Sequence, residues 1–206
     1  MKKLTFLFAF ALAMILSACN GCKKTAPEQA EAVVVKTNDF SELVAIANLE
    51  ILKNYPQGVF YEASALLAAN ENGVVDGTVD RNTFHSVYGD PYVGMCTYMA
   101  VVENDTLKLA KIEEPWLEDI VTCAFVPLTV PEAIQIIQSK VDIAFTPKTP
   151  VVLRHQLYPG EAEERFFFGS AYDCHTVNVH SLKVDQPAGG KLGNGVVAPK
   201  EDAAEK

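Results

Sequence analysis

The sequence predicts an α+β fold made of two repeated units, each with one helix followed by antiparallel strands. Asp39 precedes Glu42, and Thr129 precedes Glu132, at the spacing of a capping box, so the sequence predicts two helix starts. Pro131 falls in the first turn of the second helix. After each helix, apolar and polar residues alternate between turn residues, which is typical of strands. We expect both helices to pack on one sheet face and the other face to stay partly open.

The first unit should begin with a helix that starts near Asp39, carries apolar residues at helical spacing and stops at Asn54-Tyr55-Pro56. Asn72-Gly73 and Asp76-Gly77 favour tight turns. The stretch 78–95 is so rich in turn residues that no long element is expected there. The ranges expected as strands are 59–67, 96–102 and 106–112.

The second unit should begin with a helix that Thr129 caps and that has Pro131 in its first turn. Its apolar face consists of Ala133, Ile134, Ile137 and Val141. The ranges expected as strands are 151–158, 165–172 and 175–184. The whole chain then divides into a signal peptide (1–18), a flexible tether (19–37), the first unit (38–118), the second unit (119–185) and a disordered tail (186–206).

The first nineteen residues resemble a bacterial lipoprotein signal. Lys2 and Lys3 precede an apolar run that ends at Ala18-Cys19 and is too short to cross a bilayer comfortably. The resemblance implies cleavage before Cys19 and acyl chains on Cys19 that attach the protein to a membrane. We therefore expect a location in the cell envelope, at the periplasmic or surface face of the outer membrane. An ordinary secretory signal with an incidental cysteine is the alternative.

Charge excludes one class of partner. The formal charge of −9 becomes −11 when Lys2 and Lys3 leave with the signal. A chain this acidic does not suit the phosphate field of nucleic acid, so no nucleic acid partner is expected. No cofactor is predicted, and no metal site either, since His175 and His180 are five residues apart and a strand would point them to opposite faces.

Two further features are candidates for covalent chemistry. Besides Cys19 and a cysteine in the tether, the folded part holds three cysteines, Cys96, Cys123 and Cys174. A disulfide between Cys96 and Cys123 is one interpretation, and small buried side chains are the other. Asp105-Thr106-Leu107 resembles the sequon at which Bacteroides-type bacteria attach glycans to exported proteins, which would make Thr106 an O-glycosylation site. A simple turn explains the same three residues.

The second unit resembles the PepSY-like repeats of bacterial envelope proteins, and the first unit fits the same plan more loosely. The segments that carry this resemblance are Pro131–Ile134, Val151–Tyr158, Phe166–Gly169 and Val177–Val184. The chain also looks like lipoproteins of Bacteroides-type bacteria through Glu113–Asp119, Leu153–His155 and Tyr158–Gly160. It departs from the repeat at Ser181-Leu182, where a Thr-Gly turn is common. The resemblance implies a binding or inhibitory module, similar in plan to β-lactamase-inhibitor-like proteins, and supplies no catalytic residues.

We therefore expect a membrane-anchored, non-enzymatic lipoprotein that binds an envelope protein or polymer. One alternative is an envelope cysteine hydrolase that uses Cys174, which follows Asp173 and precedes His175. His180 is six residues from Cys174 along one strand, too far to take its proton. A purely structural spacer lipoprotein is the other alternative.

Overall fold

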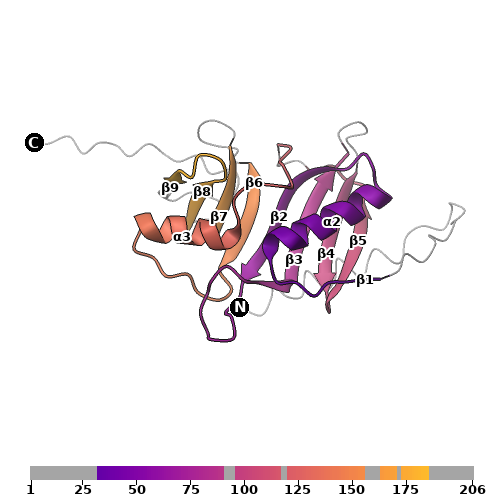
Figure 1. Cartoon of the computed structure of the whole chain (residues 1–206). Helices are drawn as coiled ribbons and strands as arrows, with labels where there is room; N and C mark the ends of the chain where they lie inside the picture. Colours follow the sequence, from indigo (N-terminus) through magenta and orange to yellow (C-terminus); the bar gives the residue numbers. More distant parts are fainter. Residues whose placement is uncertain (1–31, 91–95, 117–119, 156–162, 171–172, 186–206) are drawn as a thin grey trace, which may run out of the picture. The chain divides into compact units, whose positions relative to one another are not determined.

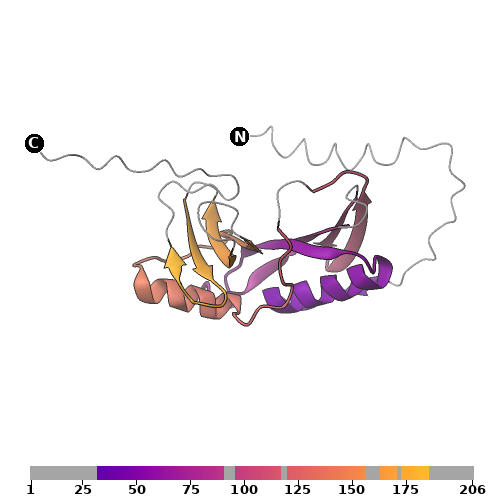
Figure 2. The same ribbon diagram turned by 90° about the horizontal axis from the view of Figure 1, so that it is seen from above.

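The computed structural model describes residues 32–90, 96–116, 120–155, 163–170 and 173–185. These residues form one antiparallel sheet of nine strands in the order β1-β5-β4-β3-β2-β6-β7-β8-β9, with two helices (Figure 1). The strands are β1 (Val33–Val34), β2 (Val59–Leu67), β3 (Val79–Gly89), β4 (Thr97–Glu103), β5 (Thr106–Ile112), β6 (Pro150–His155), β7 (Glu164–Ser170), β8 (Asp173–Asn178) and β9 (Val184–Asp185). The helices are α2 (Phe40–Asn54) and α3 (Val130–Lys140). Figure 2 shows both helices on the same side of the sheet.

The expected fold of two repeated helix-plus-strand units is wrong. Strand β2 is hydrogen-bonded on both edges, to β3 and to β6, with Ala63 opposite Ser86 on one side and Leu153 on the other. The strands of both predicted units therefore belong to one sheet. The core is continuous across this junction too, because Phe40 of α2 packs edge-on against Phe84 of β3 and Phe166 of β7. A core shared in this way buries apolar surface that two separate small units would leave in water.

Both helices begin where the sequence predicts. The side chain of Asp39 accepts a hydrogen bond from the Glu42 amide at 2.9 Å. Thr129 and Glu132 form a complete capping box, in which the Thr129 amide donates to Glu132 at 2.9 Å. The last turns end at Tyr55 and Val141, whose amides donate to the carbonyls four residues earlier. Within the described residues, no helix is long and apolar enough to span a membrane.

Strand β3 occupies most of the stretch that was expected to lack a long element. Its second half supplies core side chains, Phe84 and Tyr88. Its first half is polar, and the pairing with β2 is irregular there. Thr83 bridges the irregularity, since its hydroxyl accepts a hydrogen bond from the Leu66 amide at 2.9 Å. Turn-forming residues are therefore tolerated in this strand at a bulge, where regular pairing is interrupted.

Strand β1 lies inside the range expected to be a flexible tether. Val33 pairs with Leu107 and Val34 with Thr106 at one edge of the sheet. Val35 follows as a buried core residue, and its amide donates to the Asp105 carbonyl at 2.8 Å. Residues 33–35 therefore belong to the sheet, although they precede the predicted boundary at residue 38.

Candidate binding groove

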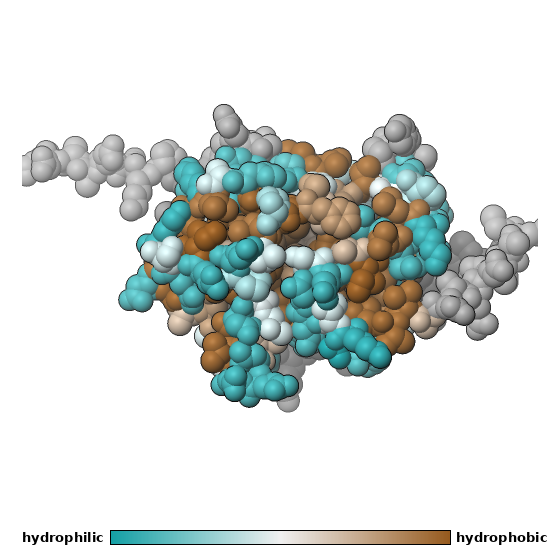
Figure 3. Space-filling view, in the orientation of Figure 1, coloured by the Kyte–Doolittle hydropathy of each residue, from teal (hydrophilic) through white to brown (hydrophobic). Residues whose placement is uncertain are grey.

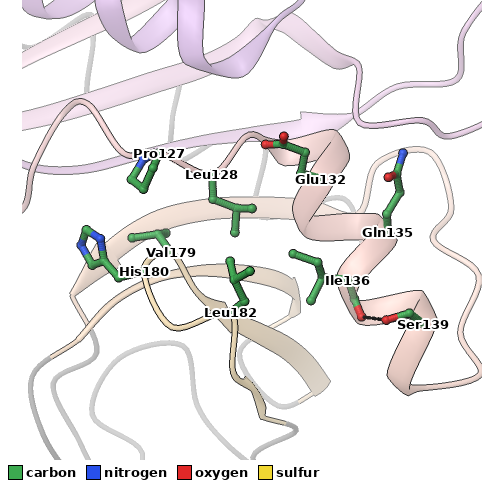
Figure 4. A pocket seen from close by; sticks show the side chains of 9 residues that line it. All are labelled: Pro127, Leu128, Glu132, Gln135, Ile136, Ser139, Val179, His180 and Leu182. Carbon is green, nitrogen blue, oxygen red and sulfur yellow. Dashed lines mark hydrogen bonds between the residues drawn. The ribbon is translucent and has the colours of Figure 1, made fainter.

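An open groove lies between helix α3 and the corner of the chain that follows β8. Its volume is about 570 Å³, within the range of roughly 300–1,000 Å³ common for ligand sites. The residues that line it are Pro127, Leu128, Glu132, Gln135, Ile136, Ser139, Val179, His180 and Leu182 (Figure 4). Figure 3 views the molecule from the side that carries both helices. It shows apolar surface around α3 and around the part of the sheet that α2 covers.

The floor of the groove is apolar and its rim is polar. Leu128 and Val179 are buried at the base, Ile136 is half-buried, and Leu182 is 41% exposed. Exposed Glu132, Gln135 and Ser139 follow one side of α3 and form the rim. A floor of aliphatic side chains favours apolar ligand groups, and the few polar atoms around it can fix their orientation.

Local hydrogen bonds give the corner a defined shape. The Asn178 side chain accepts from the amides of His180 at 2.9 Å and Ser181 at 2.7 Å. Leu182 adopts a left-handed conformation with φ of +58°, and its amide donates to the Asn178 carbonyl at 3.1 Å. The Lys140 ammonium at the end of α3 donates to the Leu182 carbonyl at 3.0 Å. The helix and the corner are thus tied together, so the groove is formed before a ligand arrives.

The charged groups of the rim are acidic or paired. Hydrogen bonds from the backbone and side chain of Thr129 lower the pKa of Glu132, so this carboxylate stays ionised at the start of α3. His180 lies 2.8 Å from the carboxylate of Glu164, whose other oxygen accepts from the Cys123 amide at 2.7 Å. The groove therefore offers a negative charge beside an apolar floor.

Cys174 does not have the setting of a reactive thiol. Its side chain is only 2% exposed. Cys174 is paired with Gly169 and His175 with Phe168, and neighbouring residues in a strand point to opposite faces. His175 accordingly lies on the helix face of the sheet beside a core phenylalanine, turned away from the thiol. A nucleophile needs both access for the substrate and an adjacent base.

A serine and a histidine whose contact is not predictable from the sequence meet on the other face of the sheet. Ser64 Oγ lies 3.1 Å from Nδ1 and 2.9 Å from Nε2 of His85. Because the oxygen is almost equally far from both nitrogens, it is not directed at the lone pair of either one. Burial lowers the pKa of His85. The pair therefore does not have the geometry of a nucleophile held by its base.

The expected disulfide between Cys96 and Cys123 does not form in the structure, where both thiols are free. Cys96 precedes β4, whereas the segment of Cys123 lies on the far side of β2, where the Thr122 amide donates to the Phe60 carbonyl. Strands β3 and β2 lie between them, at about 4.8 Å per strand spacing. A disulfide needs Cα atoms within about 7 Å. Cys123 Sγ instead donates to the Phe125 carbonyl.

Thr106 lies where the sequence predicts, directly after the turn between β4 and β5. Asn104 and Asp105 both have positive φ, at 50° and 58°, as a two-residue hairpin turn of type I′ requires. Thr106 is half-buried, and its hydroxyl donates to the Asn104 carbonyl at 3.3 Å. Its glycosylation stays a prediction. Cys19 and the whole signal lie outside the described residues, so acylation of Cys19 also stays a prediction.

The sequence did not indicate the groove. Its one visible signal is Ile136, an isoleucine that falls beside, and not on, the buried stripe formed by Ile134 and Ile137. An apolar side chain off the core stripe of a surface helix indicates a second packing surface. Among the described residues, no group of three or more histidine, cysteine, aspartate and glutamate side chains could hold a metal ion.

Comparisons with known proteins add no relatives to this description. No family model, no curated protein sequence and no solved structure matches the chain.

Proposed function

We propose that this protein is a lipid-anchored lipoprotein of the cell envelope that binds a protein partner through the groove beside α3. The anchor rests on the sequence, where a basic head and an apolar run end at Ala18-Cys19. The binding role rests on a single observation, the preformed apolar groove with an ionised Glu132 on its rim. In this role the protein acts as an adaptor or inhibitor, and any catalysed reaction is carried out by its partner.

The groove favours a protein over an envelope polymer. Its floor consists of leucine, isoleucine and valine side chains, which gain free energy by covering apolar groups. Sugars expose mainly hydroxyl groups and would bury few apolar atoms there. The partner segment should therefore carry apolar side chains for the floor and a lysine or arginine toward Glu132. The net negative charge of the whole chain also favours a partner segment with basic residues.

The anchor is tested by replacing Cys19 with alanine in the full chain. Cells are fed an alkyne analogue of palmitate, and the protein is followed in membrane and soluble fractions. We expect the wild-type chain to incorporate the label and sediment with membranes, and the variant to lose both properties. Equal labelling of the two chains would contradict acylation of Cys19.

The groove is tested with two leucine substitutions of the same kind. Leu182→Glu places a charge in the groove, and Leu49→Glu places one on the outer surface of α2, where Leu49 is 64% exposed. A photo-crosslinking residue at Ser139 on the rim identifies what binds in living cells. We expect one discrete crosslinked protein with the wild-type chain and with Leu49→Glu, and loss of it with Leu182→Glu. Equal crosslinking in both variants would refute binding in the groove.

A further inference from the structure

The segment that leads into α3 separates the groove from a second, smaller pocket. Pro127 and Leu128 line the groove, whereas Ala124, Phe125 and Val126 line the smaller pocket. The rest of this pocket, which we call the α2 pocket, comes from the start of α2 and from β6 and β7: Phe40, Ser41, Val44, Leu153 and Phe166. Its volume is about 80 Å³, against the roughly 10–15 Å³ that one water needs. The α2 pocket can therefore take one aliphatic side chain.

Residues 124–128 form a ridge between the two sites, and Phe125 lies on its outer side. Figure 2 shows this segment passing between the start of α2 and the start of α3. The chain is held just before the ridge, where the Cys123 amide donates to the Glu164 carboxylate at 2.7 Å. The residues on either side of Phe125 pack against the core, and Leu128 is buried. Phe125 itself is 61% exposed, and an aromatic side chain held in water in this way is typical of protein interfaces.

The charged groups beside the two sites are acidic. Ionised Glu132 lies on the rim of the groove. Glu42 is exposed in the first turn of α2 and follows Ser41, which lines the α2 pocket. Neither site has a lysine or arginine among the described residues that line it. This surface therefore favours a segment with basic residues.

We propose that the partner segment crosses the ridge, with one apolar side chain in the groove, a second in the α2 pocket, and a lysine or arginine toward Glu132 or Glu42. The inference rests on the proposed function, because it extends the partner site at the groove. The ring of Phe125 would pack against the partner between the two anchors. An extended chain spans about 10 Å from Phe125 to Leu128, at ~3.4 Å per residue. Anchors this far apart are about three residues apart in a strand or about seven in a helix.

The same carboxylates disfavour two other occupants. In a symmetric dimer the same patch of each copy meets its counterpart, so Glu42 and Glu132 of one copy would approach those of the other and repel them. A membrane of anionic lipids would bring phosphate groups to these carboxylates. A basic protein segment meets neither cost.

A library of random twelve-residue peptides displayed on phage tests the proposal without knowledge of the partner. The full chain is immobilised through a tag at its C-terminus, and the enriched peptides are synthesised with a fluorophore. Fluorescence anisotropy gives their affinity for the wild-type chain, for Phe125→Ser, for Leu182→Glu and for the control Leu49→Ser. The control is matched because Phe125 and Leu49 are almost equally exposed, at 61% and 64%.

We expect the enriched peptides to carry two apolar residues at one of the two spacings and at least one lysine or arginine. Phe125→Ser and Leu182→Glu should each weaken binding at least tenfold, as the loss of a central interface side chain does. Leu49→Ser should bind the peptides as the wild-type chain does.

Loss of binding in Leu182→Glu but not in Phe125→Ser would refute the crossing of the ridge and leave the groove as the partner site. Wild-type affinity in both variants, or no peptide enriched over a surface without the chain, would count against the ridge and the groove alike. A dimer that light scattering detects and that Phe125→Ser abolishes would indicate a second copy. Binding to phosphatidylglycerol vesicles that requires Phe125 would indicate a lipid surface. Either result would overturn the proposal.

Discussion

Replacing Gly77 by alanine tests whether the loop between β2 and β3 holds the start of α3 in place. Gly77 has a φ of +105°, a conformation that residues with a side chain rarely adopt. A Cβ atom at this position would lie 2.7 Å from the nitrogen, Cα and Cγ of Pro131, in the first turn of α3. Carbon atoms normally approach to about 3.5–4.0 Å, so the helix start or the loop would have to move by about 1 Å.

Gly73 in the same loop provides a matched control. It also has positive φ, at +77°, but a Cβ there would meet nothing within 4 Å. Alanine at Gly73 should cost only the left-handed conformation, about 1–2 kcal/mol of unfolding free energy. Alanine at Gly77 adds an overpacking cost of about 1–3 kcal/mol. We therefore expect a loss of about 2–5 kcal/mol for Gly77→Ala.

Equilibrium urea unfolding of both variants, followed by circular dichroism, gives the two values. The crosslink from Ser139 provides a second measurement, because displacement of the α3 start should distort the rim of the groove at Glu132. We expect Gly77→Ala to weaken the crosslink and Gly73→Ala to leave it unchanged. If the two variants lose the same free energy, the contact between Gly77 and Pro131 does not stabilise the fold, and the reasoning fails.

Three further predictions concern ion pairs, a buried histidine and the cysteines. Glu62→Gln breaks a buried ion pair and should cost about 3–5 kcal/mol in urea unfolding, whereas Glu103→Gln breaks an exposed pair and should cost under about 1 kcal/mol. Burial lowers the pKa of His85 below 6.5, so the unfolded chain binds a proton more readily than the folded chain. The free energy of unfolding should therefore decrease as the pH falls below 6.5, and His85→Gln should reduce this pH dependence in urea titrations. A maleimide should label exposed Cys123 quickly and buried Cys174 only on unfolding, as mass spectrometry can show.

Features set by neighbouring residues could be predicted from the sequence. The capping residues Asp39 and Thr129 act on amides three positions later, and the structure confirms both. The turn at Asn104-Asp105 is equally local, because these residue types tolerate positive φ. Both helices and the β4–β5 hairpin follow from such short-range rules.

Features set by distant pairing could not be predicted. The single sheet depends on the contact between β2 and β6, where Ser64 faces Val152 across a long stretch of chain. The spacing of apolar residues in either strand does not show whether one or both of its edges pair with other strands. Strand β3 was missed because Asp80 and Asn82 dominate its first half, although Phe84 and Tyr88 hold its second half in the core. The groove also arises from tertiary packing, since the α3 helix and the corner after Asn178 meet only in the folded chain.

The strand order separates the groove from the edge strand at the other end of the sheet. The described chain enters the sheet at β1, next to β5, whereas the groove is built on α3 and the corner after β8. Going from β5 to β8 crosses β4, β3, β2, β6 and β7, which at ~4.8 Å per step is about 29 Å along the sheet. The groove therefore lies at the end of the sheet opposite β1. In the anchored binding protein that we propose, the continuous sheet would hold the partner-binding groove this far from the strand at which the described chain enters the sheet.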